Sequence, residues 1–297
     1  MNPSPNRTTA SALSETFLWL LILASATLLY QPAISYMLGM WQVPIYGGAD
    51  YSHGPLLPLV SLYALWNSRA MLASAQKRTI PWGFTLVLLA LLLHWIGFRS
   101  GFHRLSLISL LLFLWGCGLS LYGTAVARLL IFPIGYLTFC IPLNILDGLS
   151  FKLRMIAATL ANEILNGFGV ASQRTGTAIY STAGGAFSFD VADPCSGIRS
   201  LLALTALSAA YAYFTQKSMP KKWLLFLFSI PIAIAANVAR IVSIALVAQL
   251  FGQEAALKVY HDYSGYIVFI VATILLMSIG QLVSKARRPQ TPTEIKP

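Results

Sequence analysis

The sequence predicts an all-α polytopic membrane protein, built as a bundle of about eight transmembrane helices. Of its 297 residues, 57% are hydrophobic and only 10% are charged. Its mean hydropathy is +0.70, whereas soluble globular proteins carry about 25% charged residues. Long apolar stretches also recur along the chain, and each is close to the roughly 20 residues that a membrane crossing requires. These observations exclude a large soluble domain.

The expected domains are a membrane domain over 17–283 and two cytoplasmic tails. The first tail, 1–16, is polar, and the apolar run after it is too long for a cleaved signal peptide. The second tail, 284–297, is basic and contains proline, which is typical of a disordered segment. The eight expected spans are 17–38, 55–72, 81–98, 105–123, 126–143, 198–214, 223–250 and 264–283.

Loop charges predict that both termini face the cytoplasm, because cytoplasmic loops are enriched in Lys and Arg. With this orientation, seven of the nine acidic residues fall in outer segments, while Arg99 and Arg104 are exceptions to the basic pattern. Twelve of the 20 Lys and Arg residues then lie inside: Arg7, Arg69, Lys77, Arg78, Arg128, Lys217, Lys221, Lys222, Lys285, Arg287, Arg288 and Lys296.

The longest segment between spans precedes the sixth span and is expected on the outer face. Residues 149–169 mix apolar and polar side chains, which predicts a helix at the membrane interface or docked on the bundle. Residues 177–180, Thr-Ala-Ile-Tyr, precede a Thr-Ala-Gly-Gly turn at 182–185, and residues 187–191 after it alternate apolar and polar side chains. This pattern predicts a small β-hairpin in the outer loop.

Composition also limits the partners and cofactors. The net charge is +11, but the basic residues lie beside apolar runs, where topology explains them, so we expect no nucleic acid. The chain has three cysteines and no CxxC or Cys/His spacing, which argues against a disulfide scaffold or a zinc site. We therefore expect a lipid bilayer as the surroundings and neither a metal nor a cofactor.

Cys195 is the most informative single residue, because it lies in a polar, turn-rich stretch that leads directly into an apolar helix. The thiolate is the nucleophilic form of cysteine, and a helix N-terminus lowers the pKa of a thiol. The backbone N–H groups of Ser196 and Gly197 lie where they can stabilise an oxyanion. Cys195 is therefore a candidate nucleophile.

Two residues distant in sequence are expected at the same membrane face. A rise of 1.5 Å per residue carries Arg240 about 25 Å from Trp223, where its span enters from the cytoplasm. His261 lies in the outer loop just before the last span. An arginine inside a span is costly and usually functional, and a histidine can activate a thiol and protonate a leaving amine.

These segments resemble the signature motifs of the exosortase/archaeosortase family. The motifs are Pro-Cys-Ser-Gly-Ile-Arg-Ser-Leu at 194–201, Asn-Val-Ala-Arg at 237–240 and His-Asp-Tyr-Ser-Gly at 261–265. Tyr-Ser-His-Gly-Pro at 51–55 resembles an upstream motif. The resemblance implies a multi-pass cysteine protease or transpeptidase with Cys195 as nucleophile and Arg240 and His261 completing a triad. Histidine at the third position favours a bacterial exosortase in the cytoplasmic (inner) membrane, here without an extra C-terminal domain.

The resemblance further implies a substrate class. Substrates of the family carry a C-terminal sorting signal, made of a short motif such as Pro-Glu-Pro, a transmembrane helix and a basic tail. Arg240, or Arg199 beside it, is expected to read the acidic residue, and the thioester is resolved by water or by an amine on a glycan or lipid. We expect supporting roles for Arg199, Asn237, Ser196, Gly197, His53 and Asp193.

Other interpretations stay open on the sequence alone. Cys195 can be a packing residue, as we expect for Cys117 and Cys140, and Cys140 lies near the outer end of its span, where a disulfide with Cys195 is an alternative. Arg240 can neutralise an acid such as Asp193. A transporter would place charges deep within repeated spans, and a thiol oxidoreductase would pair its cysteines. An acyltransferase would use the same thioester on Cys195.

Overall fold

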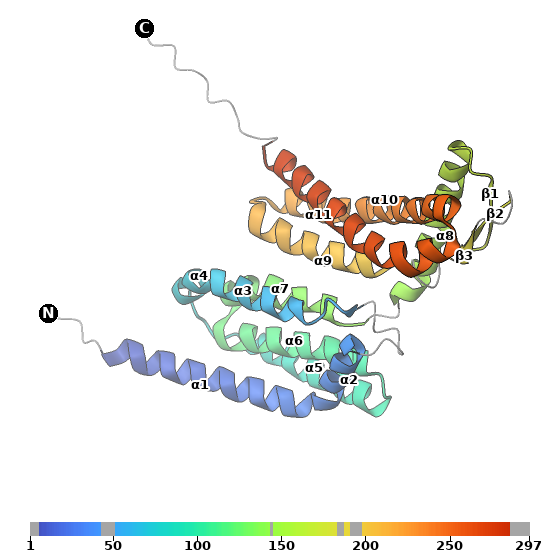
Figure 1. Cartoon of the computed structure of the whole chain (residues 1–297). Helices are drawn as coiled ribbons and strands as arrows, with labels where there is room; N and C mark the ends of the chain where they lie inside the picture. Colours follow the sequence, from blue (N-terminus) through green and yellow to red (C-terminus); the bar gives the residue numbers. More distant parts are fainter. Residues whose placement is uncertain (1–5, 43–50, 143–144, 183–186, 191–197, 286–297) are drawn as a thin grey trace, which may run out of the picture. The chain divides into compact units, whose positions relative to one another are not determined.

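The structure is a computed structural model that describes residues 6–42, 51–142, 145–182, 187–190 and 198–285. The chain divides into two compact units, Met1–Pro142 and Leu143–Pro297. Helices dominate both units, and a small sheet belongs to the second (Figure 1). Among the described helices, four are long and apolar enough to cross a membrane, or five if one bent pair forms a single span. The prediction of an all-helical, multi-pass membrane protein is confirmed at this level.

Unit 1 is entirely helical in its described part. Two segments that the sequence predicts as single spans are each divided into two helices, because the helix is interrupted at residues 30 and 68. The helices are α1 (Asn6–Leu29), α2 (Gln31–Gln42), α3 (Leu56–Asn67), α4 (Arg69–Ser74), α5 (Pro81–Arg99), α6 (His103–Tyr122) and α7 (Thr124–Tyr136), which continues into a 3-10 turn, Leu137–Cys140.

The bend between α1 and α2 differs from the straight span expected over 17–38. The two helices meet at 76°. Pro32, in the first turn of α2, lacks a backbone N–H, and its ring clashes with the preceding turn, which is a common cause of helix kinks. Tyr30 is fully buried at the bend. His94 hydrogen-bonds to the backbone of Leu29 and packs its ring 4.0 Å from that of Tyr30, so polar side chains compensate the interrupted helix.

Close backbone approach holds α5 against α6. Gly83, Ala90 and Gly97 are buried at seven-residue intervals along α5. A Cβ atom at Gly83 would lie 2.4 Å from the backbone nitrogen of Ser120, and one at Gly97 would lie 2.7 Å from Oγ of Ser106. Small residues pack membrane helices because lipid supplies no hydrophobic drive between them. This pair is therefore held by contact geometry.

All eight expected spans fall on apolar helices, but their lengths differ. Three of these helices are shorter than a full crossing over the described residues: Leu56–Asn67, Thr124–Cys140 and Ser200–Thr215. Length alone therefore assigns four or five crossings, and the count of eight stays a prediction, as does the division into one membrane domain with two tails.

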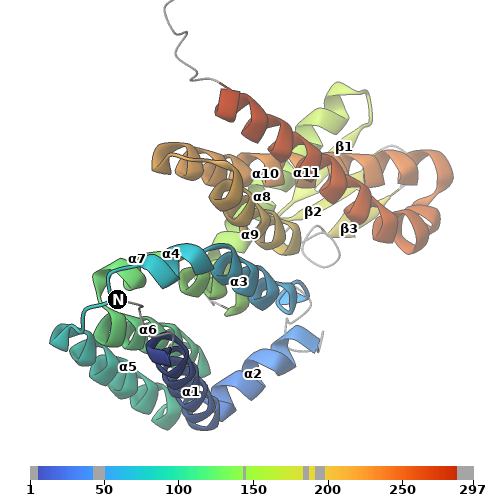
Figure 2. The ribbon, with the colours of Figure 1, turned by 90° about the vertical axis from the view of Figure 1, so that its left-hand side faces the viewer.

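In its described residues, unit 2 combines four α-helices with an antiparallel sheet (Figure 2). The strands pair in the order β1-β2-β3, and the two segments expected as a hairpin contribute β2 and β3. The additional strand β1 was missed because its residues, Ser-Gln-Arg-Thr, are all polar and show no alternation. The elements are α8 (Ile145–Gly167), β1 (Ser172–Thr175), β2 (Ala178–Ser181), β3 (Ser188–Asp190), α9 (Ile198–Thr215), α10 (Met219–Phe251), a π-helical turn (Ala255–Tyr260) and α11 (His261–Lys285).

Two hydrophobic cores divide the length of α10 between them. The first half of α10 packs with α9 and α11 through residues such as Leu204, Leu225 and Leu276. The second half, from Val238 to Ala248, packs with α8 and the sheet. The 33 residues of α10 span about 50 Å, which exceeds the roughly 30 Å hydrocarbon thickness of a bilayer. One helix thus joins a membrane bundle to a second, compact region.

The helix expected over 149–169 is α8, which has one buried face and one exposed face. It is docked on α10 through buried small and apolar residues, which agrees with one of the two expected placements. Its exposed side carries an apolar stripe, so contact with the membrane interface stays a prediction. The buried set is Ala157, Ala158, Ala161 and Leu165, and the exposed set is Ile156, Leu160, Ile164 and Phe168.

Replacing Gly83 by alanine tests the close packing of α5 on α6. The added methyl group meets the α6 backbone, so the helices must separate, and we expect the free energy of unfolding to fall by about 1–3 kcal/mol. Thermal unfolding of the detergent-purified protein measures this change. The control is Gly135→Ala on α7, where nothing lies within 4 Å of the new atom. Equal stability of the two variants would contradict the packing argument.

Candidate active site

Arg240 extends from α10 to the first turns of α11. Its Nε donates a hydrogen bond to Oγ of Ser264 at 3.2 Å, and Ser264 is completely buried. The guanidinium also lies against Gly265, where a Cβ atom would be 3.3 Å from Nη2. The arginine predicted from sequence therefore points at a neighbouring helix, and its charge is partly enclosed by protein.

A small cavity lies beside Arg240, among the three helices of the membrane bundle. Its volume is about 10 Å³, which is room for about one water molecule. Asn237 lies one helical turn before Arg240 and is 9% exposed. The first and last residues of the Asn-Val-Ala-Arg motif therefore both line this cavity. The lining is Ser200, Leu204, Ala233, Ala236, Asn237, Arg240, Gly265, Val268, Phe269 and Ala272.

The depth of Arg240 follows from the antiparallel pairing of α10 and α11. Nζ of Lys221 donates to the carbonyl of Ser284 at 3.2 Å, and Arg240 meets Ser264 nineteen residues further along α10. At 1.5 Å per residue these two contacts are about 28 Å apart, close to one hydrocarbon thickness. Arg240 and Lys221 are therefore separated by about one hydrocarbon thickness along α10.

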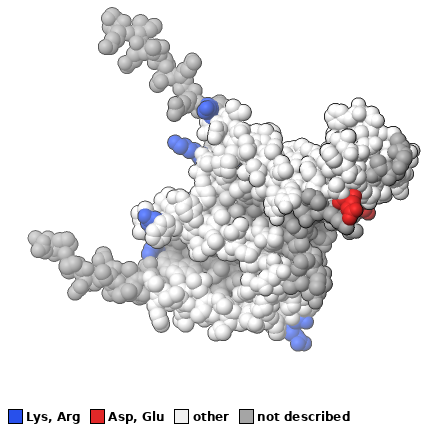
Figure 3. Space-filling view, in the orientation of Figure 1, with Lys and Arg blue, Asp and Glu red and all other residues white. Residues whose placement is uncertain are grey.

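Some charged side chains lie at opposite ends of unit 2. In Figure 3, basic side chains appear where α11 ends, and acidic side chains appear at the other end of unit 2, beside the sheet. Lys285 closes α11, whereas Asp190 closes β3 and Glu254 follows α10. Basic residues also occur at the sheet end, including Arg174 on β1, so the orientation predicted from loop charges stays a prediction.

The sheet is tied to the end of α10 by one glutamine. Gln253 donates from Nε2 to the carbonyl of Ser188 at 3.0 Å and accepts from the N–H of Ser188 at 3.1 Å, as a neighbouring strand would. On β3, Asp190 accepts from Oγ1 of Thr177 at 2.6 Å. The strand that precedes the cysteine motif is therefore anchored to the connection that precedes α11.

Several predicted site residues fall where the structure gives only part of the picture. Cys195, Ser196, Gly197 and Asp193 lie outside the described residues. The backbone of Arg199 lies in the first turn of α9, and that of His261 begins α11. The expectation that His261 lies in a loop is therefore corrected, because a π-helical turn continues directly into the last helix.

His53 and Cys140 belong to unit 1. The ring of His53 stacks 6.3 Å from that of Tyr51. Cys140 is a buried free thiol whose Sγ lies 3.9 Å from the carbonyl of Gly54. The alternative disulfide between Cys140 and Cys195 involves a cysteine outside the described residues, so it stays untested. Cys117 is likewise a buried free thiol. A role for His53 at the site stays a prediction.

Three residues near Arg240 had no role assigned from sequence. Ser264 and Gly265 were part of a motif, but their function depends on the contact between α10 and α11. The spacing of residues along the sequence does not predict that contact. Their positions three and four residues after His261 are the available signal, because residues at that interval share one helical face. Ser200, in the first turns of α9, reaches the same cavity.

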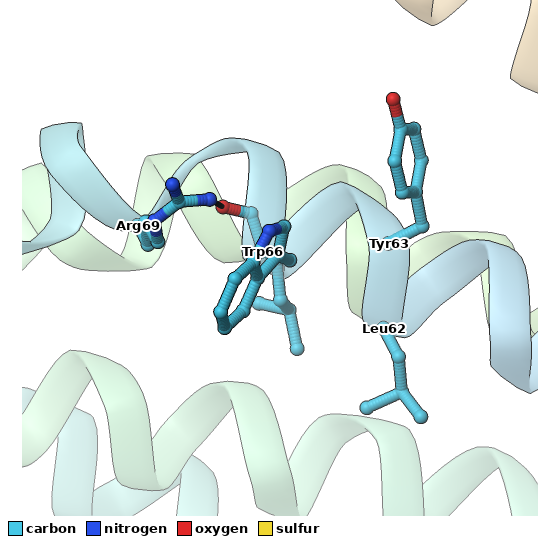
Figure 4. Close-up of a pocket in the computed structure, with 5 residues that line it drawn as sticks. Leu62, Tyr63, Trp66 and Arg69 are labelled. Atoms are coloured by element: carbon cyan, nitrogen blue, oxygen red, sulfur yellow. Dashed lines mark hydrogen bonds between the residues drawn. The ribbon is translucent and has the colours of Figure 1, made fainter.

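A larger hollow of about 660 Å³ lies on α3 and α4 (Figure 4). Arg69 holds its guanidinium 4.3 Å from the ring centre of Trp66 and donates to its carbonyl at 3.2 Å. Leu62, Tyr63 and Leu65 complete the lining. This lining contains an arginine but no thiol, histidine or carboxylate, so it lacks the nucleophile and the proton-transfer group considered above.

Fold and site together define a multi-pass membrane protein in which three motif-bearing helices converge around a partly buried arginine. The sequence pattern of a known family, transmembrane exosortase (Exosortase_EpsH), matches residues 41–278. The chain belongs to this family, as the motifs indicated. Comparisons with curated proteins and with solved structures gave no match.

Labelling of introduced cysteines tests the separation of the two ends of α10. In a Cys195→Ala background, we expect Glu254→Cys to react with a membrane-impermeant maleimide in intact cells. Lys221→Cys should react only after the membrane is permeabilised, because about one bilayer thickness separates the two ends. Labelling of both positions from the same side would contradict the crossing, and the reversed pattern would invert the orientation.

Proposed function

We propose that this protein is a cysteine protease or transpeptidase that processes C-terminal sorting signals at the extracytoplasmic face of a bacterial cytoplasmic membrane. Cys195 is the nucleophile, and Arg240 and His261 are its partners. The observation that carries the proposal is the contact of Arg240 with Ser264 and Gly265, beside a cavity that α9 also lines. All three motif-bearing segments thereby reach one end of the bundle.

Chain connectivity supports the assignment of Cys195. Helix α9 begins at Ile198, three residues after the cysteine. An extended chain covers at most about 3.6 Å per residue, so the two Cα atoms are at most about 11 Å apart. Ser200, two residues further, lines the cavity with Arg240. Only a short length of chain therefore separates Cys195 from the cavity that Arg240 lines.

Helical periodicity supports the assignment of His261. It begins α11, and Ser264 and Gly265 follow at the three- and four-residue intervals that share a face. These two residues meet the guanidinium of Arg240. The preceding π-helical turn adds support, because such turns are frequent at functional sites.

The proposed reaction is acyl transfer. The Cys195 thiolate attacks the carbonyl carbon of the sorting motif, and the oxyanion is stabilised by Arg240 and by the N–H groups of Ser196 and Gly197. His261 gives a proton to the leaving amine as the peptide bond breaks, which releases the C-terminal helix. Water or an amine on a glycan or lipid then attacks the thioester and regenerates the thiol.

The substrate class is the one that membership of the family implies, and the expected depth of the site fits it. A sorting signal anchored by its own transmembrane helix presents its short motif just above the membrane, and Arg240 lies near that surface. Arg240, or Arg199 beside it, reads an acidic residue in the motif, with Asn237 and Asp193 in support. In this proposal the chain crosses the membrane eight times, its termini are cytoplasmic, and the sheet lies outside.

Substitution of the nucleophile is the direct test. Cys195→Ala should reduce size conversion of a co-expressed, tagged protein with a sorting signal by more than about a thousandfold, because no thioester can form. The enzyme itself should remain in the membrane. Cys117→Ala, at a buried free thiol of α6, is the matched control and should keep converting the substrate. Normal conversion by Cys195→Ala would end the proposal.

A substrate change tests the reading of the acidic residue. Replacing Glu of the Pro-Glu-Pro motif by Gln removes a charge-assisted hydrogen bond, and we expect kcat/KM to fall about ten- to a hundredfold. Arg240→Lys should discriminate less between the two substrates, because lysine lacks the planar fork that matches a carboxylate. If wild-type enzyme processes both substrates equally fast, recognition of the acid is wrong.

A further inference from the structure

The guanidinium of Arg240 meets α11 along its Nε–Nη2 edge. Nε donates to Ser264, and a Cβ atom at Gly265 would lie 3.3 Å from Nη2, 3.4 Å from Cζ and 3.8 Å from Nε. Nη1 lies farther from that point than these three atoms. The Nε–Nη2 edge of the guanidinium therefore faces α11, and Nη1 is directed away from α11.

The acceptor at Nε has a fixed position. Ser264 is completely buried, and the contact of Lys221 with Ser284 sets the register of α10 against α11 at the far end of the pair. An arginine side chain loses considerable rotamer freedom when it is held in one geometry. A rigid acceptor imposes this loss before any substrate binds, which is the energetic basis of preorganisation.

Gly265 makes a separate contribution through its lack of a side chain. A Cβ contact of 3.3 Å to Nη2 is tighter than most such contacts, so a side chain here would push the guanidinium away from α11. The adjacent cavity of about 10 Å³ holds little more than a water molecule, so it leaves little space for the displaced group. Ser264 and Gly265 therefore accommodate the Arg240 guanidinium in one orientation.

We propose that Ser264 is a positioning residue for Arg240, that Gly265 provides the clearance it needs, and that together they direct the Nη1 end of the guanidinium to the substrate. The inference rests on the proposed function, in which Arg240 touches the substrate. A lysine at position 240 would carry the charge but has no Nε–H donor of this kind. The role of Ser264 should therefore disappear when Arg240 is replaced by lysine.

A double-mutant cycle between Ser264→Ala and Arg240→Lys tests this dependence. In the full-length enzyme with Arg240, Ser264→Ala should lower kcat/KM for a sorting-signal substrate about tenfold, the effect of one hydrogen bond to a charged group. In the Arg240→Lys enzyme it should have no further effect. The matched control is Ser278→Ala, also on α11, whose exposed hydroxyl bonds only its own helix at Ile274.

Thermal midpoints of the same four proteins in detergent give a second cycle, which needs no activity. Coupling in both the midpoint and kcat/KM supports the positioning role. Coupling in the midpoint with unchanged kcat/KM for Ser264→Ala overturns it, because the contact would then be structural. Absence of coupling in the midpoint also overturns it.

Gly265→Ala provides an independent displacement of the same group. It should lower kcat/KM in the Arg240 enzyme and have little effect in the Arg240→Lys enzyme, and equal losses in both would overturn the proposed clearance. Failure of this inference differs from failure of the proposed function. In the first case, Cys195→Ala and Arg240→Ala are inactive while Ser264→Ala matches wild type. In the second case, Cys195→Ala itself processes the substrate.

Discussion

The length of α10 is the constraint on which unit 2 depends. A helix of 33 residues is longer than a bilayer is thick, so its two halves must be covered by different partners. Apolar helices α9 and α11 cover one half, and α8 with the sheet covers the other. Arg240 stands where the two cores meet. A charge deep in hydrocarbon is costly, whereas at this junction protein polar groups enclose it.

Sequence periodicity and hydropathy predicted the long helices well, because α5, α6 and α10 are predominantly apolar over the length of a membrane crossing. They did not predict the break between α1 and α2. At that bend lie Pro32, which is visible in sequence, and His94 from a distant helix, whose ring packs 4.0 Å from that of Tyr30. Helix breaks in membranes depend on such remote compensation, so local sequence indicates where they can occur and tertiary structure decides whether they do.

The site shows a similar division. Arg240 was identifiable from sequence because a charge within a span is unusual. Ser264 was not, since serine is common in membrane helices and its role arises from a 3.2 Å contact across two of them. His261 was placed one element too early, because a π-helical turn extends α11 beyond the apolar run that marked its start. Residues that act through another side chain carry little signal of their own.

The pairing of Gln253 with Ser188 also affects the segment that follows β3. Residues 191–197 connect Asp190, which the sheet holds, to Ile198, which the bundle holds. The conformational entropy of a loop depends on how its ends are constrained, and here folding of the sheet and of α9 fixes both ends. The amide side chain of Gln253 therefore helps to fix Asp190, the last described residue before the cysteine motif, although the two residues are 63 positions apart in the sequence.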